Sequence, residues 1–151
     1  MKYFFILLTM IVFESANAQM PEDSIKITIN KLFTGMKNAD IRLLKSSFAD
    51  SVIFQTIIQD KQGNTIVKNE STTEFIDFVS KQSPGACDER ISFETIKLDG
   101  PLATAWTPYN FYFNGQFSHC GVNSFQLVRL NGEWKIQYII DTRRKLGCKR
   151  E

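Results

Sequence analysis

Three turn dipeptides in the last third of the chain constrain its fold more than any other feature. Asp99-Gly100, Asn114-Gly115 and Asn131-Gly132 each lie between stretches rich in aromatic and β-branched residues. Such dipeptides accept the positive φ angles of a tight two-residue turn, and they are the strongest short-range signal for a β-hairpin. They predict four antiparallel strands, at residues 89–98, 101–113, 116–130 and 133–141.

Helices are expected in the first half of the chain. Apolar residues recur at helical spacing over residues 25–36, which predicts an amphipathic first helix. Asp40 is placed to cap a short second helix. Ser71-Thr72-Thr73-Glu74 has the form of a capping box and predicts the start of a third.

Two shorter strands complete the expected elements. Residues 51–60 alternate in polarity, Gln62-Gly63-Asn64 turns the chain, and residues 65–68 return as a partner strand. The resulting order is ααββαββββ. Early helices followed by a long antiparallel meander indicate one α+β domain, in which a strongly curved sheet covers the apolar face of three N-terminal helices.

The N-terminal residues have the composition of a secretory signal peptide. Lys2 supplies a positive charge, residues 3–13 are apolar, and Ala16-Asn17-Ala18 is typical of a cleavage site. We therefore expect residues 1–18 to be removed and residues 19–151 to form a single exported domain, periplasmic or secreted. The apolar run is short for a transmembrane helix, so a stable membrane anchor is not expected.

Charge and cysteine content exclude several classes of function. The net charge of +2 gives no reason to expect a nucleic-acid partner. Three cysteines entering an oxidising compartment allow one disulfide and one free thiol, with all three pairings open. The single histidine and the cysteine spacing do not form a metal-ligand set, and nothing indicates a bound cofactor.

Counting outward from the tight turns predicts which side chains share a face of the sheet. Phe113 would pair with Gln116, which places Asn110 opposite His119. The same count brings three polar side chains and four aromatic ones onto the inner face, and we take these as candidate ligand-binding residues: Trp106, Asn110, Tyr112, His119, Asn123, Phe125 and Tyr138.

Polar groups converging on an apolar wall are typical of a small-molecule pocket. A self-satisfied network, for instance Asn110 bonded to His119, is the alternative explanation. A slip of one residue would reverse every assignment, and a bulge near Gly121 would cause one.

Two stretches of the meander resemble the nuclear-transport-factor-2-like (NTF2-like) superfamily. These are residues 105–112 (AWTPYNFY) and 117–127 (FSHCGVNSFQL), followed by Asp141-Thr142-Arg143-Arg144 and Gly147-Cys148. More narrowly, they resemble small bacterial proteins of the lumazine-binding and SnoaL-like type. The resemblance covers essentially the whole chain after residue 18.

The resemblance implies a cone-shaped fold with a cavity between helices and sheet. It also implies a homodimer formed through the outer sheet face, which by the strand count would present Tyr109, Phe111, Val122, Val128 and Ile139. Cys120 and Cys148 both belong to the family-like motif, and we expect a disulfide between them. Superfamily members include isomerases and dehydratases as well as proteins without catalytic activity, so the fold does not assign a function.

Two functions are weighed against a purely structural module with a dry core. The first is an exported binding protein whose cone holds a small molecule, heterocyclic by analogy with the lumazine-binding type. The second is a dehydratase or isomerase with His119 as catalytic acid or base. General acid–base chemistry requires both a donor and an acceptor at the substrate. The counted inner face has no carboxylate, since Asp141 falls on the outer face and residue 123 is Asn. The sequence therefore favours binding over catalysis.

Overall fold

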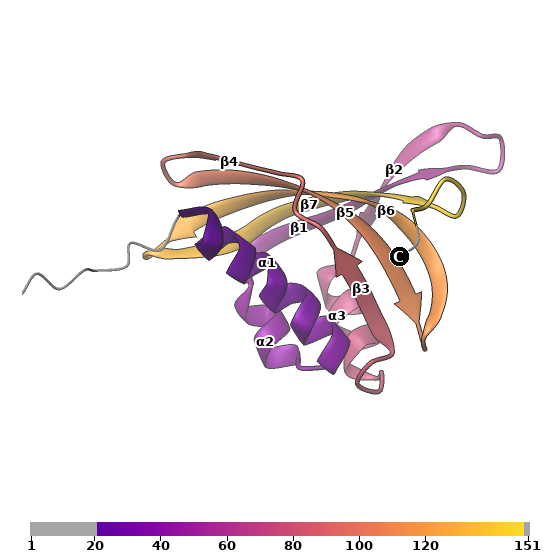
Figure 1. Cartoon of the computed structure of the whole chain (residues 1–151), viewed down its shortest axis with the longest axis horizontal. Coiled ribbons are helices and arrows are strands. Elements are labelled where there is room, and N and C mark those ends of the chain that lie inside the picture. The colour runs from indigo at the N-terminus through magenta and orange to yellow at the C-terminus, as the bar shows by residue number, and fades with distance from the viewer. Residues whose placement is uncertain (1–20, 150–151) are drawn as a thin grey trace, which may run out of the picture.

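The computed structural model describes residues 21–149, which fold into three helices and seven strands (Figure 1). The expected signal peptide at residues 1–18 lies outside the described residues. The elements, in chain order, are α1 (Pro21–Asn38), α2 (Ile41–Ser46), β1 (Phe48–Gln59), β2 (Thr65–Glu70), α3 (Thr72–Ser80), β3 (Cys87–Ile91), β4 (Thr95–Asp99), β5 (Leu102–Phe113), β6 (Gln116–Leu130) and β7 (Glu133–Arg144).

The second and third helices begin where the sequence predicts. Asp40 caps α2 by accepting a hydrogen bond from the backbone N–H of Leu43 at 2.9 Å. Ser71 caps α3 in the same way, accepting from the N–H of Glu74 at 3.2 Å. Each cap satisfies a backbone donor that has no partner inside its helix.

All seven strands belong to one curved sheet, and the helices lie on a single side of it (Figure 1). The strand order is β2-β1-β7-β6-β5-β3, with β4 also paired to β5. The α+β class and the curved sheet are as predicted. The sheet is not wholly antiparallel, however, because β1 pairs with β7 in parallel. Residues 60–132 separate these two strands, and a connection of that length permits a parallel pair.

Tight turns close the long hairpins as expected. Asn114 and Gly115 have φ angles of 50° and 75°, and Asn131 and Gly132 have 51° and 86°. Positive φ at both central residues is the backbone of a type I′ turn, for which Asn-Gly is the favoured pair.

The predicted strand over residues 89–98 is divided in the structure. β3 pairs with residues 109–113 of β5, and β4 pairs with residues 102–106. Residues 92–94, between β3 and β4, belong to no strand. The turn into β5 is also displaced, since Asp99 pairs with Leu102 and leaves Gly100-Pro101 at the tip.

Two irregularities change the register from the counted one. In the first, Tyr112 pairs with Phe117 but Phe111 pairs with His119, so Ser118 is an extra residue on β6. An inserted residue of this kind is a β-bulge. Because side chains alternate with a period of two, β6 faces as counted from His119 onward, whereas β5 turns its odd-numbered residues inward, opposite to the count.

The second irregularity lies between β6 and β7. Leu127 pairs with Ile136 but Gln126 pairs with Tyr138, which leaves Gln137 as the extra residue. The residues of β7 after Gln137 therefore face opposite to the count, and Asp141 lies on the inner face.

The hydrophobic core lies between the helices and the concave face of the sheet. One side of α1 supplies Ile25, Ile29, Leu32 and Met36, and the sheet supplies residues such as Phe125, Leu127 and Ile136. Among residues 21–149, none of the helices is long and apolar enough to cross a membrane.

Candidate functional site

A cavity of about 360 Å³ opens between α1, α3 and the inner face of the sheet. Its walls are mainly apolar: Leu32, Phe33, Met36, Phe54, Phe75, Phe78, Cys87, Phe111, Phe125 and Ile139. The remaining lining residues are polar: Gln55, Glu70, Ser71, Glu74, Glu89, Tyr109, His119, Asn123, Asp141 and Arg143. An apolar cleft with a few convergent polar groups is the usual form of a small-molecule site.

Glu89 and Asn123 face each other across this cavity, from β3 and β6. The side-chain amide of Asn123 donates to Oε1 of Glu89 at 2.8 Å. Burial raises the pKa of Glu89 to about 7, and the charge of Asp141 adds to the rise, while the bond from Asn123 and the charge of Arg143 oppose it. A carboxyl group with this pKa exchanges its proton near neutral pH.

Asp141 on β7 is held by two neighbours. Nε of Arg143 donates to Oδ2 of Asp141 at 2.8 Å, and the hydroxyl of Tyr109 lies 3.1 Å from the same oxygen. The Tyr109 hydroxyl also lies 3.0 Å from the carbonyl oxygen of Thr142. Burial, followed by the nearby carboxylates of Glu89 and Asp141, raises the pKa of Tyr109, so this phenol remains a hydrogen-bond donor.

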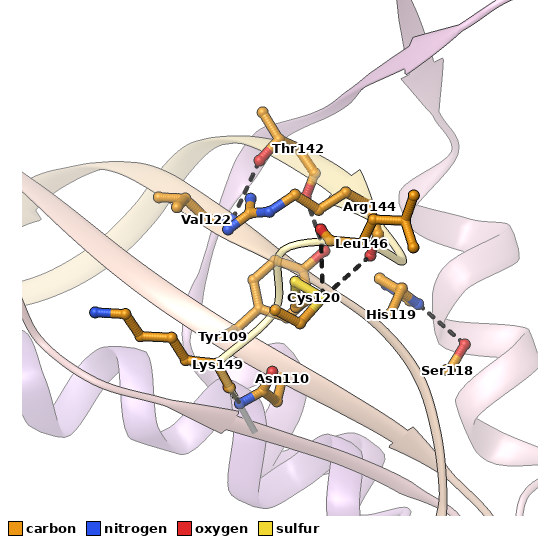
Figure 2. Close-up of a disulfide and its surroundings, with 11 residues drawn as sticks. Tyr109, Asn110, Ser118, His119, Cys120, Val122, Thr142, Arg144, Leu146 and Lys149 are labelled. Atoms are coloured by element: carbon orange, nitrogen blue, oxygen red, sulfur yellow. Dashed lines mark hydrogen bonds between the residues drawn. A yellow bond between two sulfur atoms is a disulfide. The ribbon is translucent and has the colours of Figure 1, made fainter. Parts of the chain in front are cut away.

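His119 lies on β6 beside two aromatic rings of β5. Its ring is perpendicular to that of Tyr109 at 5.7 Å and is tilted against that of Phe111 at 5.1 Å. Nδ1 lies 3.0 Å from the hydroxyl of Ser118 (Figure 2). Burial lowers the pKa of His119, and the positive charge of Arg143 lowers it further. The imidazole is therefore neutral at pH 7.

Tyr109 reaches Asp141 because its pairing partner on β6 is Gly121. A Cβ atom at residue 121 would lie 2.7 Å from Cε1 of Tyr109 and would overlap the carbonyl oxygen of Thr142. The glycine marks close packing of a ring and a neighbouring strand, a known use of glycine inside strands.

The structure brings His119, Asn123 and Phe125 into the cavity but leaves four other predicted residues outside it. Trp106 lies on the outer face of β5 and is 47% exposed. Asn110, also on the outer face, donates from its side-chain amide to the carbonyl oxygen of Lys149 at 2.8 Å (Figure 2).

Tyr112 and Tyr138 are likewise outside the cavity. The guanidinium carbon of Arg90 lies 4.2 Å from the centre of the Tyr112 ring. The hydroxyl of Tyr138 donates to Oε1 of Gln55 at 2.6 Å. The Ser118 bulge reverses the predicted faces of Trp106 and Asn110, and the Gln137 bulge reverses that of Tyr138. Tyr112 keeps its counted pairing with Phe117, but its neighbour Phe111 lines the cavity, so alternation along β5 places Tyr112 on the outer face.

Eight polar residues of the site were not predicted. Four lie on strands β3 to β7: Glu89, Tyr109, Asp141 and Arg143. The other four, Gln55, Glu70, Ser71 and Glu74, lie earlier in the chain, which the strand count did not cover. Glu89 was expected at the start of a strand, where no face was assigned. Tyr109 and Asp141 were expected on the outer face. Arg143 would share that face with Asp141, because side chains alternate along a strand. Tyr109, Phe111 and Ile139 were also expected on the outer face as part of a dimer surface, and the structure places all three in the cavity. Gly121 had indicated a possible bulge in this part of β6, and the structure has one three residues away, at Ser118. Nothing in the sequence around Gln137 had indicated the second.

Cys120 and Cys148 form a disulfide that attaches the C-terminal segment to β6 (Figure 2). This is the pairing expected from the family-like motif. The third cysteine, Cys87, is a buried free thiol in the cavity wall, and burial raises its pKa. Within residues 21–149, no three His, Cys, Asp or Glu side chains are grouped as a metal site would require.

Comparison with known proteins identifies the fold. No model of a known protein family matches the sequence, and no curated protein is a detectable relative. Among solved structures, the chain is similar to an NTF2-like protein of unknown function from Shewanella baltica, with a TM-score of 0.63 and 14% identity over 82% of this chain and 94% of the other.

Two further structures agree with this result. One is an NTF2-like protein of unknown function from Methylobacillus flagellatus, with a TM-score of 0.63 and 15% identity over 85% of this chain and 97% of the other. The second is a protein of unknown function with a cystatin-like fold from Nostoc punctiforme, with a TM-score of 0.64 and 12% identity over 83% and 92%. The chain therefore has the NTF2-like cone fold, as the sequence resemblance predicted. Its assignment to the lumazine-binding or SnoaL-like type remains a prediction.

Proposed function

We propose that this protein binds a small organic molecule inside the cone. The observation that carries the proposal is the cavity of about 360 Å³, whose walls are apolar and whose polar groups come together on the sheet. The apolar part of a ligand would lie against Phe33, Phe75 and Phe125. Its polar part would meet Glu89 and Asn123.

Thermal-shift and calorimetric screening of a small-molecule library tests this proposal, with two matched variants. Ile139 and Ile140 are neighbours on β7, but only Ile139 lines the cavity. Ile139→Phe reduces the space for a ligand and should weaken binding, whereas Ile140→Phe should leave the affinity unchanged. Equal effects of the two variants, or a library without any saturable binder, would contradict the proposal.

A second candidate function is proton transfer on a carbonyl compound. The observation that favours it is the presence of Glu89 and Asp141 in the same cavity as His119, where the strand count had found no carboxylate. A carboxyl group with a pKa near 7 and a neutral imidazole are suited to exchange protons with a bound substrate. Deuterium uptake from solvent by a bound carbonyl ligand, lost in Glu89→Gln and in His119→Asn, would support catalysis.

Export and self-association complete the proposal. The Cys120–Cys148 disulfide supports export, because disulfides persist in oxidising compartments. The outer face exposes Trp106 and Ile53, which are 47% and 52% exposed and would suit a homodimer contact. Light scattering should then give a dimer, and Trp106→Lys should give a monomer of unchanged thermal stability.

A further inference from the structure

The cavity has an excess of negative charge over positive charge. Four carboxylates line it, those of Glu70, Glu74, Glu89 and Asp141, against the single guanidinium of Arg143. Arg143 is already engaged, since its Nε donates to Asp141 at 2.8 Å. The one cationic side chain of the lining thus offsets one carboxylate and leaves the others for different partners.

Glu89 differs from Glu70 and Asp141 in having a neutral partner. Glu70 at the mouth has Lys68 at 3.3 Å, and Asp141 has Arg143. The bond recorded for Glu89 comes from the uncharged amide of Asn123. A carboxylate enclosed by protein without a cation is unfavourable, because the bond from an amide recovers only part of its lost hydration.

The walls around this carboxylate are rich in aromatic rings. Phe33, Phe75, Phe111 and Phe125 line the same cavity. The face of an aromatic ring carries partial negative charge and attracts ammonium groups. Rings together with a carboxylate at one end form the combination that recognises an organic cation.

The alternative is an anionic ligand that pairs with Arg143. The side chain of Arg143 is 45% exposed, so its remaining N–H donors reach solvent at the mouth. An anion entering deeper would meet Glu89 and Asp141, and the neutral His119 would provide no compensating charge. The charges of the lining therefore oppose an anion.

We propose that the ligand of the cone is an organic cation, with a protonated amine that pairs with Glu89 and an apolar, preferably aromatic, body against the phenylalanine walls. This inference rests on the proposed binding function and specifies its ligand class.

Because Glu89 titrates near neutral pH, the affinity for an organic cation should depend on pH. The groups that face Glu89 are Asn123 and Tyr109 and the charged pair Asp141 and Arg143, with His119 on the same strand as Asn123. Without a ligand its pKa is about 7. A bound cation favours the ionised form, so affinity for an amine should rise as the pH increases through 7 and reach a plateau by pH 8.

Two series of probes that share one aromatic body, with an amine and an alcohol of equal size and a slightly larger acid in each, test the ligand class. We would measure calorimetric affinities of 2-phenylethylamine, 2-phenylethanol and 3-phenylpropanoate, together with the indole analogues tryptamine, tryptophol and indole-3-propanoate, at pH 8. The amines should bind at least about tenfold more tightly than the alcohols, as a charge-assisted bond requires. Glu89→Gln should remove this advantage, whereas Glu94→Gln, an exposed glutamate outside this cavity, should retain it.

The outcomes separate the two proposals. Equal binding of amines and alcohols, or tighter binding of the acids, would overturn the cation inference and leave the binding function in place. Binding by none of the six probes would also overturn it, and the library screen would then decide the binding function independently. If Glu89→Gln does not fold, the wild-type protein still decides the question. The ratio of amine to alcohol affinity must fall between pH 8 and pH 5, and a constant ratio would contradict the inference.

Discussion

At Gly121 the backbone of β6 passes so close to its neighbours that no larger residue fits. Gly121→Ala would force the added methyl group against the Thr142 carbonyl and the Tyr109 ring. Overpacking of this kind costs at least about 2 kcal/mol of unfolding free energy. Urea denaturation should show the loss. Ser124→Ala, on the same strand but outside the cavity, serves as the control and should stay within about 0.5 kcal/mol of wild type. A stable Gly121→Ala protein would mean that Tyr109 does not lie across β6 as described.

Glu89 makes stability depend on pH, and the sign follows from its raised pKa. The folded state holds this proton up to about pH 7, whereas the unfolded chain releases it near the ordinary value of 4.5. The favourable contribution is therefore complete below pH 4.5 and is lost as the pH rises through 7. Relative to Glu89→Gln, which mimics the protonated form, wild type should lose on the order of 2 kcal/mol between pH 4.5 and pH 8.

Urea midpoints of the two proteins at pH 5 and pH 8 measure this difference. Glu133→Gln provides the contrast, because Lys135 lowers the pKa of the exposed Glu133 carboxyl. That variant should show no comparable loss above pH 5. A constant difference between wild type and Glu89→Gln across this range would place the carboxyl of Glu89 in solvent rather than in the cavity.

Among the elements, α3 offers a direct test of how the helices are fixed. Ser71→Ala removes the hydroxyl that accepts from the N–H of Glu74, and loss of such a cap costs about 1 kcal/mol. Ser80→Ala at the other end of the helix removes only a bond to the Asp77 carbonyl and should cost less. Because α3 borders the cavity, Ser71→Ala should also weaken ligand binding. Equal thermal shifts for both variants would argue against the cap.

The elements show which features could be predicted from the sequence and which could not. Helix starts depend on local side-chain chemistry, so Asp40 and Ser71 indicated them correctly. The Asn-Gly turns depend on local backbone preference and were also correct. The faces of β5 and β7 depend on whether each strand pair is regular over its full length. Gly121 indicated that a bulge could occur in this part of β6, but only the three-dimensional structure places the bulges at Ser118 and Gln137.

The candidate site was consequently predicted in part. His119, Asn123 and Phe125 are on β6, whose faces the bulges leave as counted, and all three line the cavity. Trp106 and Asn110 are on the strand that the Ser118 bulge reverses. Asp141 was predicted on the outer face and lies on the inner face in the structure. Its carboxylate contributes to the excess of negative charge in the cavity.

For the whole molecule, the disulfide between Cys120 and Cys148 restricts the unfolded chain. It closes a loop spanning 28 residues, for which loss of chain entropy predicts a stabilisation of roughly 3–4 kcal/mol. The double variant Cys120→Ala with Cys148→Ala should lose about this amount in chemical denaturation. Reductant should shift wild type to the same midpoint and leave the double variant unchanged. Wild-type stability in the double variant would contradict a stabilising role of this disulfide.

The parallel pairing of β1 with β7 has a consequence for how this molecule is made. A ribosome produces β1 long before β7, since Phe48 pairs with Ile136 and Ile53 with Tyr138. The position in the sheet beside β1 therefore stays vacant until β7 has been synthesised. The β5–β6–β7 meander is assembled from neighbouring segments, but closing the cone requires contacts between distant parts of the chain, which form slowly. A nascent chain of this protein thus cannot enclose its cavity until β7, which supplies Ile139, Asp141 and Arg143 to the lining, has emerged.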